Sequence, residues 1–474
     1  MAHPTCTRFG IAVGYTSAWV CSAFLLMSCS VNAPITGQDL RNQALPQISV
    51  PNKFSTGTNT GTQLDDAWLK QFNDVELETL VAEALKNHPD VRIIAARRLQ
   101  AEALIDAAGG AQYPGVGVIG NTGGKVGSSG SGLTGYYIGA NWELDLWGRV
   151  RTAVAGAKQN ARALNAEQDA ARLSLVGTLT KTVWLARGLQ DQARLAQENA
   201  DAAKRYAQLT EIREQIGASS KNDVAFARTA AAQSQEVALI SKQARDQSLR
   251  AVEILVGRYP QGALFQNTQL PKLPPPIAPG IPTDILERRP DIIAAEARVN
   301  SAFYTASEKR LARLPKISLT AGFGYINSQV FSLVNGPTSS LGVGANVMMP
   351  LFQGGAIEAQ IAYQNAEAQA ALANYGKVVL NAFGDVENAL TGEMTWRERS
   401  VLLGSQLKEQ KQILQRIEQE FKIGRIDQRQ IQQQKIKTNT TEMSYRQGQV
   451  DALTQRVNLY LALGGSPLLN FSIV

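Results

Sequence analysis

The side chains that most often carry enzyme chemistry are scarce in this 474-residue sequence. The only histidines are His3 and His88, which nearly excludes a catalytic or metal site built on histidine. Residues 115–120 have the Gly-x-Gly-x-x-Gly spacing of a nucleotide-binding loop, yet more glycines follow them instead of the helix that would hold the phosphate. We interpret this segment as a strand that leads into an external loop. We expect no catalytic residues and no metal.

The charge of the chain also narrows the possible partners. The formal net charge is +7, which is mild for 51.1 kDa, and the basic residues are interleaved with acidic ones. Nucleic-acid-binding proteins instead gather basic residues into a patch or stripe, often with aromatic residues between them. We therefore expect no nucleic-acid partner.

The N-terminal segment predicts export and lipidation. All three cysteines lie in the first 29 residues, so disulfides do not hold the mature fold together. Arg8 and the apolar run Phe9–Met27 are typical of a secretory signal peptide over residues 1–28. Leu26-Met27-Ser28-Cys29 resembles a lipobox, so we predict that Cys29 carries a covalent lipid and that the protein has no other cofactor. The alternative is an ordinary signal peptide that is cut nearby, with Cys29 incidental. Ser30, which stands after the cysteine in place of Asp, resembles the pattern of lipoproteins that are sorted to the outer membrane.

The most informative feature is an internal duplication. Landmarks recur in the same order at offsets of 201 to 207 residues. The matching pairs are His88-Pro89-Asp90-Val91 with Arg289-Pro290-Asp291-Ile292, Gly139-Ala140-Asn141 with Gly344-Ala345-Asn346, Gly217 with Gly424, and Val256-Gly257 with Leu463-Gly464. Two copies of one unit of roughly 200 residues therefore fill most of the mature chain.

The duplication and the composition predict the domain organisation. Residues 260–282 separate the copies and hold seven of the 18 prolines, so we expect a stiff, extended connector. The predicted order is a signal peptide (1–28), a lipid-anchored coil (29–74), the first repeat (75–259), the connector (260–282), the second repeat (283–465) and a C-terminal tail (466–474).

Each copy opens with a short helical stretch, residues 75–111 or 283–312, and continues with two strands. In Thr134–Leu146, Ile317–Tyr325 and Leu341–Leu351, apolar side chains alternate with small or polar ones. This period of two predicts strands with one apolar face and one wet face. A soluble sandwich would give the same pattern, but segments of about ten residues also suit tilted membrane-spanning strands whose apolar face contacts lipid.

Each strand pair leads into a long helical hairpin. No proline occurs in residues 149–216, 221–256 or 351–466. Small and apolar residues recur with coiled-coil spacing, in three series: Ala193, Ala196, Ala200, Ala203 and Ala207; Leu195, Ala202, Leu209 and Ile216; and Leu403, Leu407, Leu414, Ile417 and Phe421. At 1.5 Å per residue, the first of these helices would span about 100 Å. The turns are predicted at residues 217–220 and 424–427. There Gly suits the left-handed backbone conformation that often ends a helix, and Ser or Asp can cap the next helix.

Four strands in one chain cannot close a barrel in a membrane. An open strand edge in lipid leaves backbone groups unpaired, and each such group costs several kcal/mol. If the strands span a membrane, several chains must pool them, and the face of small and polar residues would then line a water-filled lumen.

The sequence resembles a known family. The residues that carry the resemblance are the duplication, the block Arg288-Arg289-Pro290-Asp291-Ile292 after Pro279-Gly280-Ile281-Pro282, Leu314-Pro315, and the paired glycine turns. Together they resemble the outer-membrane factor (TolC-like) family, and more closely its NodT-type lipoproteins of resistance–nodulation–division (RND) efflux systems. The resemblance implies a mixed membrane α/β fold: a trimeric, 12-stranded transmembrane β-barrel with four strands per chain, continuous with a long α-helical coiled-coil barrel in the periplasm. It implies as partners two further copies of the chain, a periplasmic adaptor protein, an inner-membrane RND pump and outer-membrane lipid.

The resemblance also assigns candidate site residues. In the family, the hairpin turns contact the adaptor and close the tube; by position this role falls on Gly217, Ser219, Gly424, Arg425 and Asp427, which could instead merely cap helices. Family members place acidic residues one and two turns after the second turn glycine. Gln430 and Gln433 stand there in this chain, which leaves Asp223 as the acidic candidate at the periplasmic aperture.

For the motif Arg288-Arg289-Pro290-Asp291 we expect a structural role, with Pro290 at the first position of a helix. Anion binding by the two arginines is the alternative.

Three functions remain open. The favoured one is a passive exit duct for small molecules, driven by a partner pump, and therefore not an enzyme. The second is a duct for secreted polypeptides. The third is a lipid-tethered coiled-coil scaffold without a pore, which explains the hairpins and Cys29 but not the four amphipathic strands.

Overall fold

The computed structural model describes residues 37–465 except 49, 52, 56–66, 122–132, 264, 266–267, 279, 281 and 329–337. The predicted signal peptide, Cys29 and the tail 466–474 lie outside the described residues. Internal contacts divide the chain into two units. The first contains Gln100–Ala161 and Ala297–Ala373, and the second contains Leu45–Leu99, Arg162–Glu296 and Asn374 onward.

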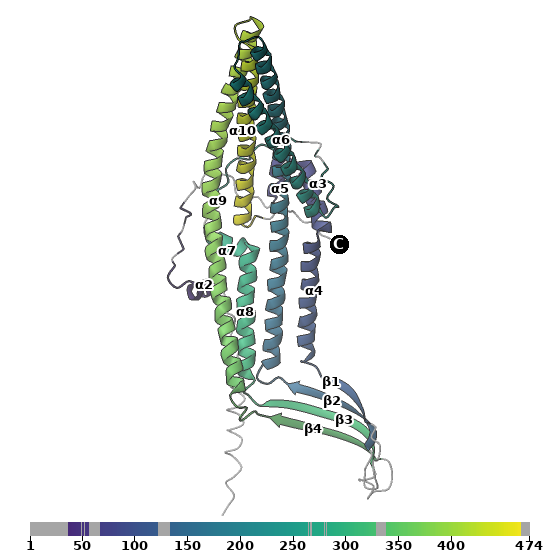
Figure 1. The fold of residues 1–474 in the computed structure, drawn as a ribbon. Coiled ribbons are helices and arrows are strands. Elements are labelled where there is room, and N and C mark those ends of the chain that lie inside the picture. The colour runs from purple at the N-terminus through teal and green to yellow at the C-terminus, as the bar shows by residue number, and fades with distance from the viewer. Residues whose placement is uncertain are drawn as a thin grey trace, which may run out of the picture. The chain divides into compact units, whose positions relative to one another are not determined.

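The first unit contains one antiparallel sheet. Its strands are β1 (Gly115–Asn121), β2 (Leu133–Leu144), β3 (Lys316–Ser328) and β4 (Thr338–Met348), in the order β1-β2-β3-β4 (Figure 1). The central pair joins the two copies, because β2 belongs to the first and β3 to the second. The predicted strands are confirmed, although β2 and β4 end two and three residues earlier than expected.

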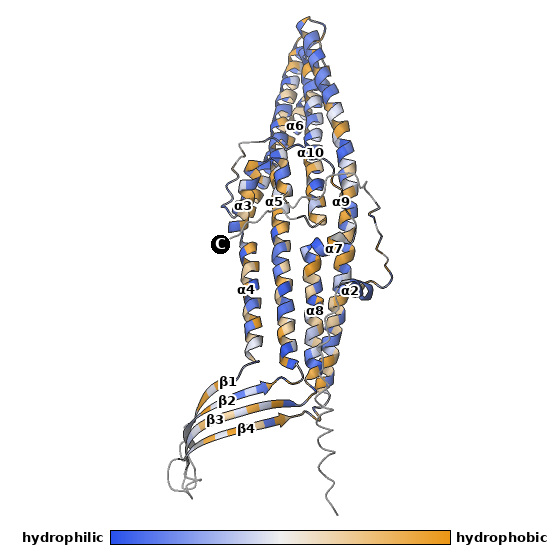
Figure 2. Cartoon of the chain, turned by 180° about the vertical axis from the view of Figure 1, so that it is seen from behind, coloured by the Kyte–Doolittle hydropathy of each residue, from blue (hydrophilic) through white to orange (hydrophobic). Residues whose placement is uncertain are grey.

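The register of the sheet sorts its side chains into two faces. One row across the four strands is Val118, Ile138, Phe323 and Leu341, and the apolar row beside it is Val116, Ala140, Ala321 and Val343. The row between them consists of Gly117, Gly139, Gly322 and Gly342. Because successive strand residues point to opposite faces, the glycines lie on the face opposite the apolar rows. Apolar residues recur along all four strands in Figure 2.

A turn after β2 starts the first long helix, α5 (Arg149–Gln215). The Asp145 carboxylate caps this helix by accepting hydrogen bonds from the backbone N–H groups of Val150 (2.9 Å) and Arg151 (2.8 Å). Arg149 forms ion pairs with Glu143 at 2.8 Å and with Glu308 of the second copy at 3.0 Å. The strand end and the helix start are therefore fixed to each other within this unit.

The helical hairpins consist of α5 with α6 (Lys221–Val256) and α9 (Ala356–Lys422) with α10 (Gln428–Ala462). The alanines that recur at 3,4 spacing in α5, namely Ala193, Ala196, Ala200, Ala203 and Ala207, are all buried, as predicted. Ile216, the last member of the seven-residue series, lies one residue beyond the end of α5 and is 74% exposed in the single chain. Phe421, the last member of the α9 series, is 40% exposed. Both residues lie beside a hairpin turn, where few side chains of the same chain pack against the helices. None of the described helices combines the length and apolarity needed to cross a membrane.

The helical stretches that open each copy are divided, which corrects the single helices expected there. In the first copy α3 (Val75–Asn87) precedes α4 (Pro89–Gly110), and in the second α7 (Asp284–Arg288) precedes α8 (Pro290–Leu311). The residue before each proline is extended, with ψ of 128° at His88 and 119° at Arg289. The cause is steric, since the proline ring disfavours the helical conformation of the residue before it. Pro290 occupies the first helical position, as predicted.

The segment 29–74, predicted as a coil, contains the helix α2 (Gly37–Ala44) and a 3-10 turn, η1 (Trp68–Phe72). Trp68 is fully buried, stacks on Tyr460 of α10 with ring centroids 5.0 Å apart, and donates a hydrogen bond to the Gly465 carbonyl at 3.2 Å. Phe72 packs against Trp184 of α5 with centroids 4.7 Å apart. Burial of these aromatic rings fixes a segment that is too short for a periodic pattern to reveal.

The described residues of the connector 260–282 contain no helix, as expected from its prolines. Its backbone carbonyls accept hydrogen bonds from two arginines of the second hairpin. Arg456 donates to the Pro275 carbonyl at 2.5 Å, and Arg397 donates to the Pro274 carbonyl at 3.0 Å.

Candidate functional sites

Both hairpin turns have the same backbone hydrogen bonds. In the first, the Gly217 N–H donates to the Glu214 carbonyl and the Ala218 N–H donates to the Arg213 carbonyl. In the second, Gly424 and Arg425 donate to Phe421 and Glu420 in the same pattern. Both glycines have φ of +75°, a conformation that glycine adopts without strain. These are Schellman motifs, so both glycines have the predicted structural role at the helix ends.

The next helix after the first turn is capped by Ser220, and Ser219 lies within the turn. The Ser220 hydroxyl accepts a hydrogen bond from the Asp223 N–H at 3.1 Å, and one Asp223 carboxylate oxygen accepts from the Ser220 N–H at 2.8 Å. This is a capping box. The backbone hydrogen bond from Ser220, together with its hydroxyl, lowers the pKa of Asp223 below its ordinary value of 3.8. Asp223, the candidate for the aperture, is therefore an exposed carboxylate that remains ionised.

The second turn has a different set of side chains. The Asp427 carboxylate caps α10 by accepting from the Arg429 N–H at 2.7 Å, and it also accepts from the Arg429 guanidinium at 2.8 Å. It lies 3.6 Å from Arg213 of α5, so an ion pair joins the second turn to the first hairpin. Burial raises the pKa of Asp427, but the hydrogen bonds from Arg429 and the positive charges of Arg429 and Arg213 outweigh it and lower the pKa overall.

The remaining candidates near the turns are exposed. Arg425 lies in the second turn, and the side chains of Gln430 and Gln433 follow it on the surface of α10. Gln433 lines a cavity of about 400 Å³ together with Tyr206 of α5 and Val237 of α6. The polar surface near the second turn glycine thus carries amides where carboxylates were expected from the family pattern.

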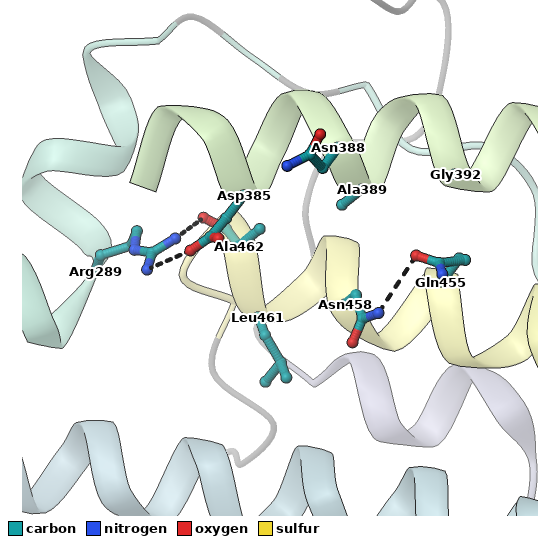
Figure 3. A pocket seen from close by; sticks show the side chains of 9 residues that line it. All are labelled: Arg289, Asp385, Asn388, Ala389, Gly392, Gln455, Asn458, Leu461 and Ala462. Carbon is teal, nitrogen blue, oxygen red and sulfur yellow. Dashed lines mark hydrogen bonds and ion pairs between the residues drawn. The ribbon is translucent and has the colours of Figure 1, made fainter. Parts of the chain in front are cut away.

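The Arg-Pro-Asp motif is an ion-pair junction. The Arg289 guanidinium binds both carboxylate oxygens of Asp291, at 3.1 and 2.7 Å, and it reaches Asp385 of α9 at 3.2 Å. It also donates to the Ala462 carbonyl at the end of α10, at 3.2 Å (Figure 3). Burial lowers the pKa of Arg289, but Asp291 and Asp385 outweigh it and raise the pKa, so the side chain stays charged. Three segments far apart in sequence therefore meet at one side chain, whereas Arg288 is exposed.

In each copy, a glycine after the last hairpin helix packs against the residues just before the proline that starts α4 or α8. A Cβ atom at Gly464 would lie 3.1 Å from the backbone of Arg288 and Arg289, and one at Gly257 would lie 3.1 Å from the Cβ of Asn87. Asn87 and Arg288 each precede the residue before a proline that starts a helix. In both copies the glycine at the end of the helical hairpin thus packs closely against the C-terminal end of the short helix α3 or α7.

Sequence reasoning missed two buried arginines. Arg187 of α5 is 1% exposed and binds Asp74 at 2.5 and 3.1 Å and Glu76 at 2.8 Å. Arg456 of α10 is fully buried and pairs with Glu393 of α9. The partners of Arg187 are more than 100 residues away in sequence, so no local spacing could have revealed them.

Comparison with known proteins decides the family. The sequence pattern of the "Outer membrane efflux protein" family matches residues 80–258 and 281–465, which together are most of the chain. This chain belongs to the outer membrane efflux protein family. It is a transport protein and not an enzyme, and it serves as the outer-membrane channel of an efflux pump.

Individual relatives of this efflux protein extend over most of its length. It is 30% identical to the pyoverdine export outer membrane protein OpmQ of Pseudomonas putida, over 79% of this chain and 83% of the relative. It is 26% identical to the cation efflux system protein CusC of Escherichia coli, over 94% and 97%. Among solved structures, the outer-membrane channel OprN superposes with a TM-score of 0.73 at 25% identity, covering 89% of this chain and 98% of OprN. The CmeC channel of Campylobacter jejuni shares the fold, with a TM-score of 0.77 at 21% identity over 92% and 94%.

Proposed function

We propose that three copies of this efflux protein form the exit duct of a tripartite pump, through which small molecules pass passively from the periplasm to the exterior. In this proposal the acylated Cys29 anchors each chain in the outer membrane, and the helical hairpins form a barrel in the periplasm. The segment boundaries predicted from the sequence, with repeats at 75–259 and 283–465, belong to the same proposal. The two separately matched segments and the repeated turns support these boundaries.

One observation carries the proposal: the sheet has an apolar face and an opposite face on which glycine and small polar residues predominate. Val118, Ile138, Phe323 and Leu341 form one row, and Val118, Ile138 and Leu341 are 68%, 41% and 79% exposed in the single chain. Exposure of such a large apolar surface to water is unfavourable, and on the outside of a membrane barrel the surface would contact lipid instead. The glycine face then suits a lumen that contains water.

The edges of the sheet explain why the duct needs more than one chain. Within the described residues, β1 pairs only with β2 and β4 pairs only with β3. In a bilayer each free edge would leave backbone groups without hydrogen bonds. Three chains that join β4 of one to β1 of the next would close a barrel with no free edge.

The hairpin turns are the proposed contact with a periplasmic adaptor protein, and through it with an inner-membrane RND pump that supplies the energy. Their exposure and rigid caps support this role, since a preorganised surface loses little entropy on binding. With Gln430 and Gln433 at the aperture, Asp223 would supply its negative charge. Such an aperture would attract cations less than one with additional rings of carboxylates.

The relatives favour small cargo, because they are named for pyoverdine export, cation efflux and toluene efflux. A strain that lacks this protein should therefore become sensitive to small toxic compounds while its secreted proteins stay unchanged. Loss of a secreted protein with unchanged sensitivity would favour the polypeptide duct.

The direct test is the native mass of the full-length protein after extraction from outer membranes in mild detergent. We expect the mass of three chains, each starting at an acylated Cys29. A Cys29→Ser variant is the matched control, and it should lose the lipid while any trimer that forms keeps the same stoichiometry. A stable monomer would overturn the duct, because four strands have no way to close.

A further inference from the structure

The face of the sheet that bears the glycine row contains a single aromatic side chain within the described strands. Tyr137 of β2 points to this face, since it lies two residues from Gly139 and pairs with Gly324. It pairs with Ile119 of β1 on one side and with Gly324 of β3 on the other, and glycines and small polar residues such as Thr320, Ser318 and Asn346 follow further along the face. The adjacent Tyr136 points the other way and stacks on Tyr325, with ring centroids 6.0 Å apart.

The phenol ring of Tyr137 lies flat across three glycines. A Cβ atom at Gly139 would lie 2.6 Å from the ring, and one at Gly324 would lie 2.8 Å from it. A Cβ at Gly322 would overlap the phenol oxygen itself, and its three nearest atoms would all belong to Tyr137. Gly139, Gly322 and Gly324, which we call the glycine seat, thus leave the space that the ring occupies. No other residue type leaves this space, because every other side chain begins with a Cβ.

The seat covers only one side of the ring. Tyr137 is 40% exposed, so a substantial part of the phenol remains open on the face of glycine and polar residues. Gly342 lies next to Gly322 in the same row, and a Cβ there would meet nothing within 4 Å. The Tyr137 ring therefore fills the space above the glycine seat, whereas the space above Gly342 is open.

We propose that Tyr137 is the residue of the passage that contacts planar aromatic solutes, and that the glycine seat holds its ring against the wall so that the bore stays open. This inference rests on the proposed function, because it takes the glycine face as the lumen. In a trimer, three phenol rings would lie at one level of the bore. An exposed ring face offers offset stacking to a flat aromatic molecule. The glycines and small polar groups of the face offer little contact, and Ile119 beside the ring offers apolar contact without stacking.

The test uses the full-length protein in planar lipid bilayers, with ion conductance and current block by ethidium, a planar aromatic cation, as the two measurements. Gly322→Ala should lift the ring from its seat into the bore and lower the conductance. Gly342→Ala adds the same methyl group to the same row where there is space, and it is the matched control. Combining Gly322→Ala with Tyr137→Leu should restore the conductance, since the clash disappears with the ring. Tyr137→Leu alone should weaken ethidium block about fivefold, which corresponds to the loss of one stacked aromatic pair.

If Gly322→Ala does not assemble, the double variant decides, because removal of the ring should also restore assembly. Equal conductance of the two alanine variants, failure of the double variant to recover, or unchanged ethidium block in Tyr137→Leu would each overturn the role of Tyr137 while the channel itself stands. A wild-type protein that forms no channel would overturn the proposed function and this inference with it.

Discussion

Placing a charge on the apolar face of the sheet tests the membrane assignment at single-residue resolution. Ala140 lies eighth among the 12 residues of β2, between Val116 and Ala321 in an apolar row. Its neighbour Asn141 points to the glycine face and pairs with Thr320. If the apolar face contacts lipid, an arginine at position 140 must place its guanidinium in the hydrocarbon region. This costs about 2–4 kcal/mol per chain near the bilayer midplane and less toward the interface.

The assay is urea unfolding of the protein reconstituted in lipid vesicles, with the trimer fraction followed by native electrophoresis. Ala140→Arg should lower the free energy of unfolding by about 2 kcal/mol or more. Asn141→Arg should change it little, because its side chain would extend into a water-filled lumen. Ala140→Leu controls for size on the same face and should be tolerated. Contact of the apolar face with lipid is refuted if Asn141→Arg destabilises the protein as much as Ala140→Arg, or if Ala140→Arg unfolds like the wild type.

Three further predictions concern residues of the second unit. Arg187→Met should lower the free energy of unfolding in urea by about 3–5 kcal/mol, because Asp74 stays buried without its partner; a loss below about 1 kcal/mol would contradict the buried ion pair. Ser220→Ala should destabilise the first hairpin turn by about 1 kcal/mol through loss of the helix cap, whereas Ser219→Ala should not; hydrogen exchange in α6 distinguishes them, and equal effects would contradict the assigned cap. The pKa of Asp223 is depressed in the fold, so the stability that its carboxylate contributes is present above its ordinary value of 3.8 and is lost as the pH falls through the lower folded value. The Ser220 amide should then lose its protection, so that its hydrogen exchange approaches the intrinsic rate at that pH; protection that is unchanged after Asp223 is protonated would count against the capping box.

Local patterns in the sequence predicted the long helices, the strands and the hairpin turns of this fold. The absence of proline from residues 149–216, the two-residue alternation in the strands and the glycines at the turns each depend on neighbours a few positions away. Such signals also predicted Pro290 at a helix start. They failed where a segment is short and fixed by distant partners, as at Trp68, whose ring stacks on Tyr460.

The candidate sites show the same limit. The turn residues could be found because a Gly followed by Ser or Asp has a local structural meaning. The seat of Tyr137 could not, since Gly322 lies 185 residues away in the sequence and only the register of β2 with β3 brings them together. The pairing of Arg187 with Asp74 likewise follows from how the helices pack, which no spacing within α5 encodes.

The two hairpin turns also have a consequence for symmetry. Their backbones are bonded alike, but the first presents the Ser220–Asp223 pair and the second presents Asp427 held by Arg429 and Arg213. In an assembly of three chains, a ring of turns would repeat sixfold in shape and only threefold in charge. A partner with sixfold shape could then contact every turn in either of two orientations that differ by one turn. Its charges would match the turns in only one of these two orientations. The difference between the two turns would therefore set the rotational register of a partner that docks on the ring.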